Sequence, residues 1–200
     1  MKTNRTIRDQ VTDRIRNEVV AGKFPPGQPL REKEVAQRYG VSHGPVRDAF
    51  LQLTHEGFLV YQANRGVTVR QPPDPENRDF IVSLRQQIEV FVLQRGFEFL
   101  AEQANLDRIS ASLKNLKIAC LAEDLSAVAH NDIAFHQAIL TSCGGEDYLP
   151  IWKWLCSQML MMYSRLEDYM QVYQEHADIF EALNNRKKKA TISALKANIL

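Results

Sequence analysis

Apolar residues spaced four apart open the chain and predict a helix. Ile7, Val11, Ile15 and Val19 form a single stripe, which is typical of a helix that buries one face. Gly22 and the prolines of the KFPPGQP segment then end this helix. The chain therefore begins with one amphipathic helix followed by a sharp break.

Two more helices, separated by a tight turn, follow this break. The first is predicted for residues 32–39, and Gly40 suits the sharp exit because glycine readily adopts the left-handed conformation. Ser42 is a good N-cap residue for the next helix, which runs to about Glu56. This spacing is typical of a helix-turn-helix.

A short hairpin completes the N-terminal region. Residues 58–62 and 67–70 alternate like strands, and Ala63-Asn64-Arg65-Gly66 between them is suited to a hairpin tip. Helix, turn, helix and hairpin in this order predict a winged helix-turn-helix. Such a domain places its second helix in the major groove of DNA.

The pattern changes after a proline-rich break. The QPPDPE segment at 71–76 is predicted to be a linker, because proline cannot continue a helix. Residues 77–200 contain one further proline, Pro150, and otherwise follow helical periodicity. We expect a mainly α protein with a winged helix-turn-helix domain at 1–70 and an all-helical bundle at 77–200. Its helices are predicted at 77–104, 106–121, 124–142, 146–168, 171–184 and 187–200.

Charge and cysteine content support this division. Residues 1–75 carry 12 Lys/Arg against 8 Asp/Glu, whereas residues 76–200 carry 13 against 16, so the basic excess lies where DNA would bind. No apolar run approaches the roughly 20 residues that cross a bilayer. Three cysteines without a CxxC pair fit a reduced, cytoplasmic chain.

Several polar residues are placed to contact DNA. Arg47, near the start of the second helix of the motif, can offer its fork to guanine or clamp a phosphate, and Arg65 at the hairpin tip can enter a minor groove. The alternative is that each is an ordinary surface residue. The candidate DNA contacts are Lys33, Ser42, His43, Gly44, Arg47, Arg65 and Gly66.

Residues 7–70 resemble the GntR family of bacterial transcriptional regulators. The motif comprises Gly22-x-Phe24-x-Pro26-Gly27, Leu30-x-Glu32, Val35-Ala36, Tyr39-Gly40-Val41-Ser42, Pro45-Val46-Arg47-Asp48-Ala49, Leu51-x-Leu53, Gly57 and Arg65-Gly66-x-x-Val69. The resemblance implies binding to double-stranded operator DNA. His43 departs from the pattern, because the family usually has arginine at this position. Without that arginine, this chain lacks one strong contact to a base or a phosphate.

Two residues in the second half have the spacing of metal ligands. Asp132 and His136 are four apart, so they share one face of a predicted helix. A carboxylate and an imidazole so placed can take two positions around one metal ion, and His176 on a later helix can supply a third. The alternative is a set of hydrogen-bonded polar groups without a metal.

The helical half is similar to the FCD ligand-binding domain of FadR-type GntR regulators. That resemblance implies a divalent metal of the zinc, nickel or manganese class, held by Asp132, His136 and His176 and, in place of a usual histidine, Asn198. It also implies that Arg85 and Glu89 on the first bundle helix contact a carboxylate effector. A surface ion pair between Arg85 and Glu89 is the alternative.

These features favour a homodimeric transcriptional regulator without enzymatic activity, most simply a repressor controlled by a small organic acid. Two half-sites on one duplex would need two DNA-reading heads. A DNA-binding dimer with a vestigial effector site remains open. A metal-dependent hydrolase is the third hypothesis, although the chain lacks an HExxH helix and a clear general base.

Overall fold

A computed structural model describes residues 5–161 and 168–199. The N-terminal part holds three helices and a small sheet: α1 (Ile7–Val20), β1 (Pro29–Leu30), α2 (Glu32–Tyr39), α3 (His43–Glu56), β2 (Leu59–Gln62) and β3 (Gly66–Val69). The rest is helical: α4 (Pro75–Gly96), η1 (Phe97–Ala101), α5 (Gln103–Leu121), α6 (Leu125–Ser142), η2 (Glu146–Tyr148), α7 (Leu149–Leu160), α8 (Tyr169–Asn184) and α9 (Lys188–Asn198). The mainly α fold with an N-terminal winged helix-turn-helix is thus confirmed.

The N-terminal head forms around the predicted apolar stripe. Ile15 of α1 is fully buried in the apolar cluster that joins α1, α2 and α3, and α1 packs mainly against α3. Gly40, with φ of 68°, ends α2 in the left-handed conformation, and Gly57, with φ of 90°, ends α3 in the same way. The antiparallel sheet has the order β1-β3-β2, so the two-residue β1, which the periodicity did not predict, covers the free edge of β3.

The helical domain contains the six predicted α-helices, with some boundaries moved. The helix predicted for 77–104 begins at Pro75, which suits the first helical position after the Asp74 cap. It changes to the 3₁₀ segment η1 at Gly96, where a Cβ atom would overlap the carbonyl oxygen of Cys143. The helix predicted for 146–168 is seen as η2 and α7, and its stretch at 162–167 lies outside the described residues.

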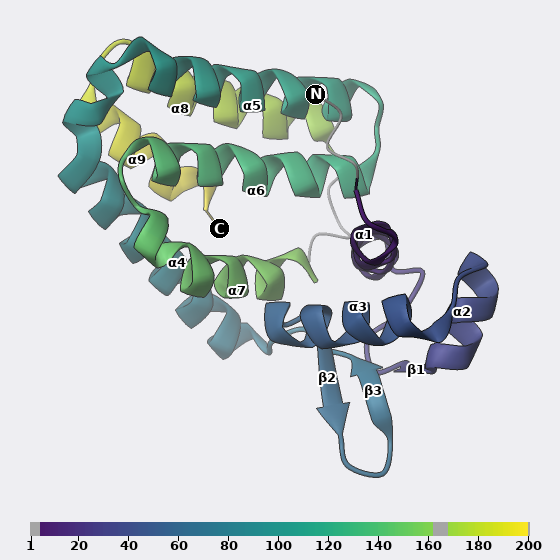
Figure 1. The fold of residues 1–200 in the computed structure, drawn as a ribbon. Coiled ribbons are helices and arrows are strands. Elements are labelled where there is room, and N and C mark those ends of the chain that lie inside the picture. The colour runs from purple at the N-terminus through teal and green to yellow at the C-terminus, as the bar shows by residue number, and fades with distance from the viewer. Residues whose placement is uncertain (1–4, 162–167, 200) are drawn as a thin grey trace.

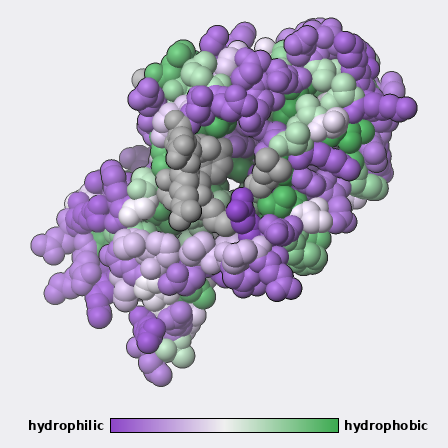
Figure 2. All heavy atoms as spheres, turned by 180° about the vertical axis from the view of Figure 1, so that it is seen from behind, coloured by the Kyte–Doolittle hydropathy of each residue, from purple (hydrophilic) through white to green (hydrophobic). Residues whose placement is uncertain are grey.

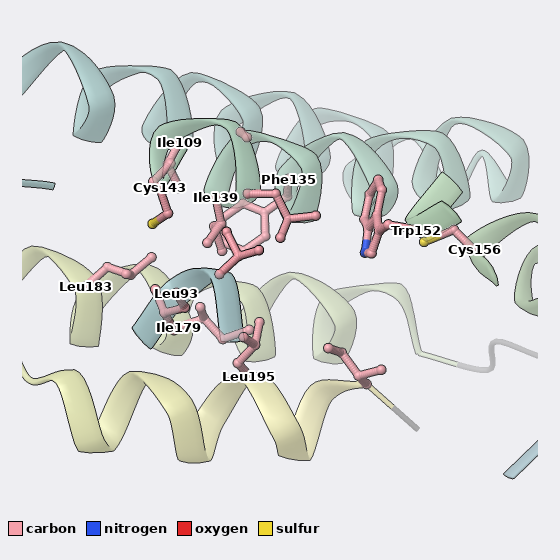
Figure 3. Packing of buried hydrophobic residues seen from close by; sticks show 14 of the residues in the cluster. Leu93, Ile109, Phe135, Ile139, Cys143, Trp152, Cys156, Ile179, Leu183 and Leu195 are labelled. Atoms are coloured by element: carbon pink, nitrogen blue, oxygen red, sulfur yellow. The ribbon is translucent and has the colours of Figure 1, made fainter. Parts of the chain in front are cut away.

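The bundle packs around one large apolar core. In Figure 1, α5 runs alongside α6 and α8, α7 lies between α6 and α3 of the head, and α4 runs diagonally along one side of the bundle. Leu93, Ile139, Ile179 and Leu195 converge on this core from four helices (Figure 3). No helix among residues 5–161 and 168–199 has both the length and the apolar character to span a membrane.

The head and the bundle share packed residues. Ala129 of α6 and Leu160 of α7 are buried in the apolar cluster of the head. Arg16 of α1 forms a bidentate ion pair with Glu56 at the end of α3, on the side that faces this junction. The end of α3 is therefore tied to α1 beside the junction of the head and the bundle.

Candidate functional site

The predicted DNA-contacting residues all belong to the head, at the starts of α2 and α3 and in the β2–β3 hairpin. In Figure 1, α2 and the start of α3 lie at one end of the head, and the hairpin projects from the head away from the bundle. The head is mostly hydrophilic on the face seen in Figure 2. Ser42, His43, Gly44 and Arg47 are all exposed at the start of α3. Lys33 is exposed in the first turn of α2.

The hairpin presents its tip in the way a wing requires. Arg65 is exposed, and the turn passes through positive φ at Asn64 and Gly66, where asparagine and glycine are tolerated. Gln62 pairs with Gly66 at the closing end of the ladder. The backbone therefore places Arg65 in the exposed turn of the hairpin.

Ser42 occupies the N-cap position of α3, as predicted, but its side chain does not perform the predicted capping role. Its backbone is extended, with φ of −73° and ψ of 166°, yet its hydroxyl forms no capping hydrogen bond. By contrast, Asp74, Asp124 and Asp168 each cap a bundle helix with a side-chain hydrogen bond. The exposed Ser42 hydroxyl thus remains available to an external acceptor such as a phosphate.

Arg47 forms an ion pair that the sequence pattern did not predict. Its Nε lies 3.2 and 3.3 Å from the two carboxylate oxygens of Glu32, and one terminal nitrogen lies 3.1 Å from Oε2. The carboxylate raises the pKa of Arg47, chiefly through this hydrogen bonding. Glu32 belongs to the Leu30-x-Glu32 motif, which was the only signal in the sequence that could have pointed to it.

The second candidate site is a charged centre buried between four helices of the bundle. Arg85 and Glu89 come from α4, Asp132 and His136 from α6, His176 from α8 and Asn198 from the end of α9. All but Asn198 are buried, and His136 and His176 are fully so. The structure therefore brings together all six residues that the resemblance implied.

Hydrogen bonds hold this centre in one arrangement. Arg85 donates from Nε to Glu89 Oε1 at 2.8 Å, which makes their pair buried rather than a surface pair. Trp152 of α7 donates its indole N–H to the same oxygen at 2.7 Å. The terminal nitrogen of Arg85 nearest Asp132 lies 4.0 Å from its Oδ1 and donates no hydrogen bond within the described residues.

Both histidines turn Nε2 toward Asp132, while their Nδ1 atoms are held by other partners. Nδ1 of His136 lies 2.7 Å from Glu89 Oε2, and Nδ1 of His176 lies 2.7 Å from the carbonyl oxygen of Val172. Because both partners can only accept, each Nδ1 carries a proton, which leaves Nε2 as a lone-pair donor in the neutral ring. Those Nε2 atoms lie 3.6 and 3.5 Å from Asp132 Oδ1.

Asn198 adds a fourth electron-pair donor, beside those of Asp132, His136 and His176. Its Oδ1 lies 2.9 Å from Nε2 of His136, while its amide nitrogen lies 3.3 Å from a carboxylate oxygen of Glu175. Glu175 thereby orients the amide so that oxygen, rather than nitrogen, faces the histidine. Two electron-pair donors facing each other at this distance need a cation, either a proton or a metal ion.

The spacing of these donors fits a metal ion. The coordinating atoms of Asp132, His136 and His176 all lie within 4.8 Å of one another. The 3.5 and 3.6 Å separations from Asp132 Oδ1 match the edge, about 3.4 Å, of a tetrahedron with zinc–ligand bonds of about 2.1 Å. Asp132, His136 and His176 therefore fit a divalent ion. The 2.9 Å from Asn198 Oδ1 to His136 Nε2 is shorter than this edge, so Asn198 would have to shift to become a fourth, weaker ligand.

The charges of the centre reinforce one another. Burial would raise the pKa of Glu89, but the facing His136 and Arg85 outweigh burial and lower it to about 2. Burial also opposes ionisation of Asp132, whose pKa is nevertheless held below its usual range by His176, His136 and Arg85. Burial would lower the pKa of His176, yet Asp132 raises it. Two carboxylates are thus ionised at neutral pH and attract positive charge to Asp132.

The fold and these two sites define a class: DNA-binding transcriptional regulators with a winged helix-turn-helix head and an all-helical second domain. The family "Bacterial regulatory proteins, gntR family" matches residues 7–69, and the FCD domain family matches residues 80–199. The chain therefore belongs to the GntR family of bacterial regulators, in the group that carries an FCD domain.

Relatives of known name span most of the chain. The HTH-type transcriptional repressor RspR of Escherichia coli K12 is 28% identical over 199 residues, which cover 96% of this chain and 86% of the relative. The gluconate operon transcriptional repressor of Bacillus licheniformis is 25% identical over 202 residues, which cover 94% and 80%. The solved structure of E. coli McbR/YncC shares the fold, with a TM-score of 0.78 at 20% identity over 98% of this chain and 94% of that one.

Proposed function

We propose that this protein is a repressor whose binding to operator DNA is controlled by a small organic acid bound at the buried charged centre, with help from a divalent metal. The observation that carries this proposal is the position of α7 between the two sites. On one side, Trp152 donates to Glu89 and Met159 receives a contact from Arg85 at 3.6 Å. On the other side, Gln158 donates to the carbonyl oxygen of Gly57, at the end of the recognition helix, at 3.2 Å.

A carboxylate is the ligand chemistry that the centre favours. Arg85 is buried and fixed by Glu89, with N–H groups still available at its far end. A guanidinium fork suits two carboxylate oxygens, and a buried donor without a partner is costly. The name of the B. licheniformis relative refers to the gluconate operon, and gluconate is itself a carboxylate.

Asp132, His136, His176 and Asn198 would hold the metal. When bound, the ion would act as a Lewis acid that anchors the oxygens of an organic acid. Glu89 and the Val172 carbonyl keep the two imidazoles in the required tautomer. Because an amide oxygen is a weaker ligand than imidazole for zinc or nickel, we expect weaker binding than a three-histidine site would give.

Effector binding would act on DNA through α7. A ligand that draws Arg85 or Trp152 away from Glu89 changes contacts on one face of this helix, while the opposite face holds Gly57. In the proposed dimer, the two heads would have an arrangement that binds the operator and one that does not. The ligand shifts the population between these arrangements only if it binds one of them more tightly than the other. Repression agrees with the names of both relatives. A homodimer would supply two heads for two half-sites.

Thermal denaturation with a panel of organic acids, each with and without Zn²⁺ or Mn²⁺, tests the effector site. We expect one or more acids to raise the melting temperature and to change affinity for a duplex selected by the protein from a randomised pool. Arg85→Lys should abolish the thermal shift, because lysine keeps the charge but loses the planar fork. No shift with any acid would instead favour a DNA-binding dimer with a vestigial site.

Elemental analysis of the purified protein, with His136→Ala beside it, tests the metal. We expect a near-stoichiometric divalent metal in the wild type and a clear loss in the variant. Negligible metal in both would mean that protons, rather than an ion, satisfy the facing donors. Hydrolytic turnover in the absence of DNA would favour the hydrolase hypothesis.

Arg47→Ala tests the assignment of the recognition helix. We expect binding to the selected duplex to weaken about 10- to 100-fold, the discrimination that one bidentate base contact provides. Unchanged binding would remove Arg47 from the DNA interface.

A further inference from the structure

We infer that Glu32 is a positioning residue for DNA recognition: it holds the side edge of the Arg47 guanidinium, so that Arg47 meets DNA with its end edge. This inference rests on the proposed role of Arg47. It adds a specificity-determining residue on α2, outside the recognition helix.

The geometry of the pair is directional. Every contact with Glu32 uses Nε and one terminal nitrogen of Arg47, at 3.1 to 3.3 Å, so the carboxylate occupies one long edge of the guanidinium plane. The two terminal nitrogens remain as a second edge with its own pair of N–H donors. That edge matches the O6 and N7 acceptors of guanine in the major groove.

The placement of Glu32 makes it a suitable anchor. It is the first residue of α2, where the helix dipole favours a carboxylate, and its side chain is 33% exposed against 72% for Arg47. The carboxylate is therefore the better fixed partner, and the arginine extends from it toward solvent. α2 and α3 are packed together through Val35, Ala36 and Val46, so the spacing of the pair is set by the core of the head.

An exposed ion pair contributes little in water, because solvent screens it and both side chains lose conformational freedom. At a protein–DNA interface, however, water is partly excluded and the same contact becomes stronger. The pair therefore acts mainly when DNA is bound. Without Glu32, Arg47 would turn to the nearest phosphate, which gives affinity but no sequence information.

The inference predicts opposite effects on two kinds of DNA. In Glu32→Ala, affinity for an unrelated duplex should rise slightly, because a negative charge near the phosphates is removed. The ratio of affinities for the selected and unrelated duplexes should fall about tenfold, because Arg47 no longer holds one orientation. Glu32→Gln should give an intermediate ratio, because the amide oxygen can still accept one hydrogen bond.

Glu34→Ala is the matched control. Glu34 carries the same charge in the same turn of α2, but its ion-pair partner is Arg31 at 3.7 Å rather than Arg47. Removing it should raise non-specific affinity to a similar degree and leave the ratio unchanged. Comparing the two variants therefore separates orientation of Arg47 from the general effect of charge and from any weakening of α2.

The experiment measures fluorescence anisotropy of the full-length chain on both duplexes over a range of salt concentrations. The double variant Glu32→Ala/Arg47→Ala should have the same ratio as Arg47→Ala, since Glu32 acts through Arg47. If Arg47→Ala lowers the ratio while Glu32→Ala and Glu34→Ala behave alike, the inference is overturned and the role of Arg47 stands. If Arg47→Ala leaves the ratio unchanged, both the inference and the proposed role of Arg47 are overturned.

Discussion

Two arginine–glutamate pairs, one in each half of the chain, use the same chemistry in opposite surroundings. In the head, the Arg47 and Glu32 side chains are 72% and 33% exposed, whereas in the bundle Arg85 and Glu89 are 5% and 1% exposed. The exposed pair contributes little in water, and Arg47 keeps a second edge on which it can accept DNA as an additional partner. The buried pair cannot lose a partner without leaving an uncompensated charge. We conclude that the first is suited to contact an external partner and the second to hold a fixed arrangement that a ligand must disturb.

The largest predicted effect is that of removing the anion from the buried pair. Glu89→Ala leaves Arg85, His136 and the indole of Trp152 without their shared partner. We expect a loss of about 3–5 kcal/mol in the free energy of unfolding, as for other broken buried pairs. Urea denaturation of the full-length chain, followed by circular dichroism, measures it.

Glu32→Ala is the control for this prediction, because it breaks the exposed pair of the same chemistry. Its unfolding midpoint should stay close to that of the wild type. A loss below about 1 kcal/mol for Glu89→Ala would place the bundle pair in the range of surface pairs. The contrast between the two pairs would then disappear.

The sequence alone predicts that Arg85 and Glu89 lie on one face of a helix, but not whether that face is buried. Arg85 and Glu89 are four apart, so a shared helix face follows from periodicity. Whether that face is buried depends on α6, α7, α8 and α9, which are all distant from it in the sequence. The surface alternative was therefore as well founded in the sequence as the buried pair, and only packing distinguishes them.

The other site residues divide in the same way. Gly40, the Ser42 cap position and the Arg65 hairpin tip were found because turn chemistry is local. Contact between Glu32 and Arg47 crosses the turn between two helices, and no local rule encodes it. Similarly, spacing alone pairs Asp132 with His136, whereas the approach of Asn198 was an expectation from the family resemblance that the structure now places 2.9 Å from His136.

A smaller effect is predicted at the junction that links the two pairs. Gly57 ends α3 with φ of 90°, and a Cβ atom there would lie 2.5 Å from the amide nitrogen of Gln158 and 2.9 Å from Ser157 Oγ. Gly57→Ala should therefore combine backbone strain with a clash against α7, at a cost of about 2–3 kcal/mol. Urea denaturation measures the total.

Gly40→Ala isolates the part due to the junction. Gly40 also ends a helix in the left-handed conformation, with φ of 68°, but a Cβ atom there would meet nothing within 4 Å. It should cost about 1 kcal/mol, from strain alone. Equal losses in the two variants would mean that the Gln158 and Ser157 side chains move aside at no cost. The contact between α7 and the end of α3 would then be too loose to transmit a change from the buried centre.

The smallest predicted effect concerns the caps of the two regions. Asp124 caps α6 by accepting from the backbone N–H of Ala127 at 3.0 Å, whereas Ser42 makes no such bond at the start of α3. Asp124→Ala should cost about 1 kcal/mol of stability, and Ser42→Ala less than about 0.5 kcal/mol.

Binding to DNA should reverse this order. Ser42→Ala should weaken binding to the selected duplex by a few fold while sequence preference is retained, because a phosphate contact positions the protein without reading bases. Asp124→Ala should leave binding unchanged, since α6 lies in the bundle. If Ser42→Ala instead destabilises the head as much as Asp124→Ala destabilises α6, the hydroxyl serves the helix in solution, and it is not reserved for DNA.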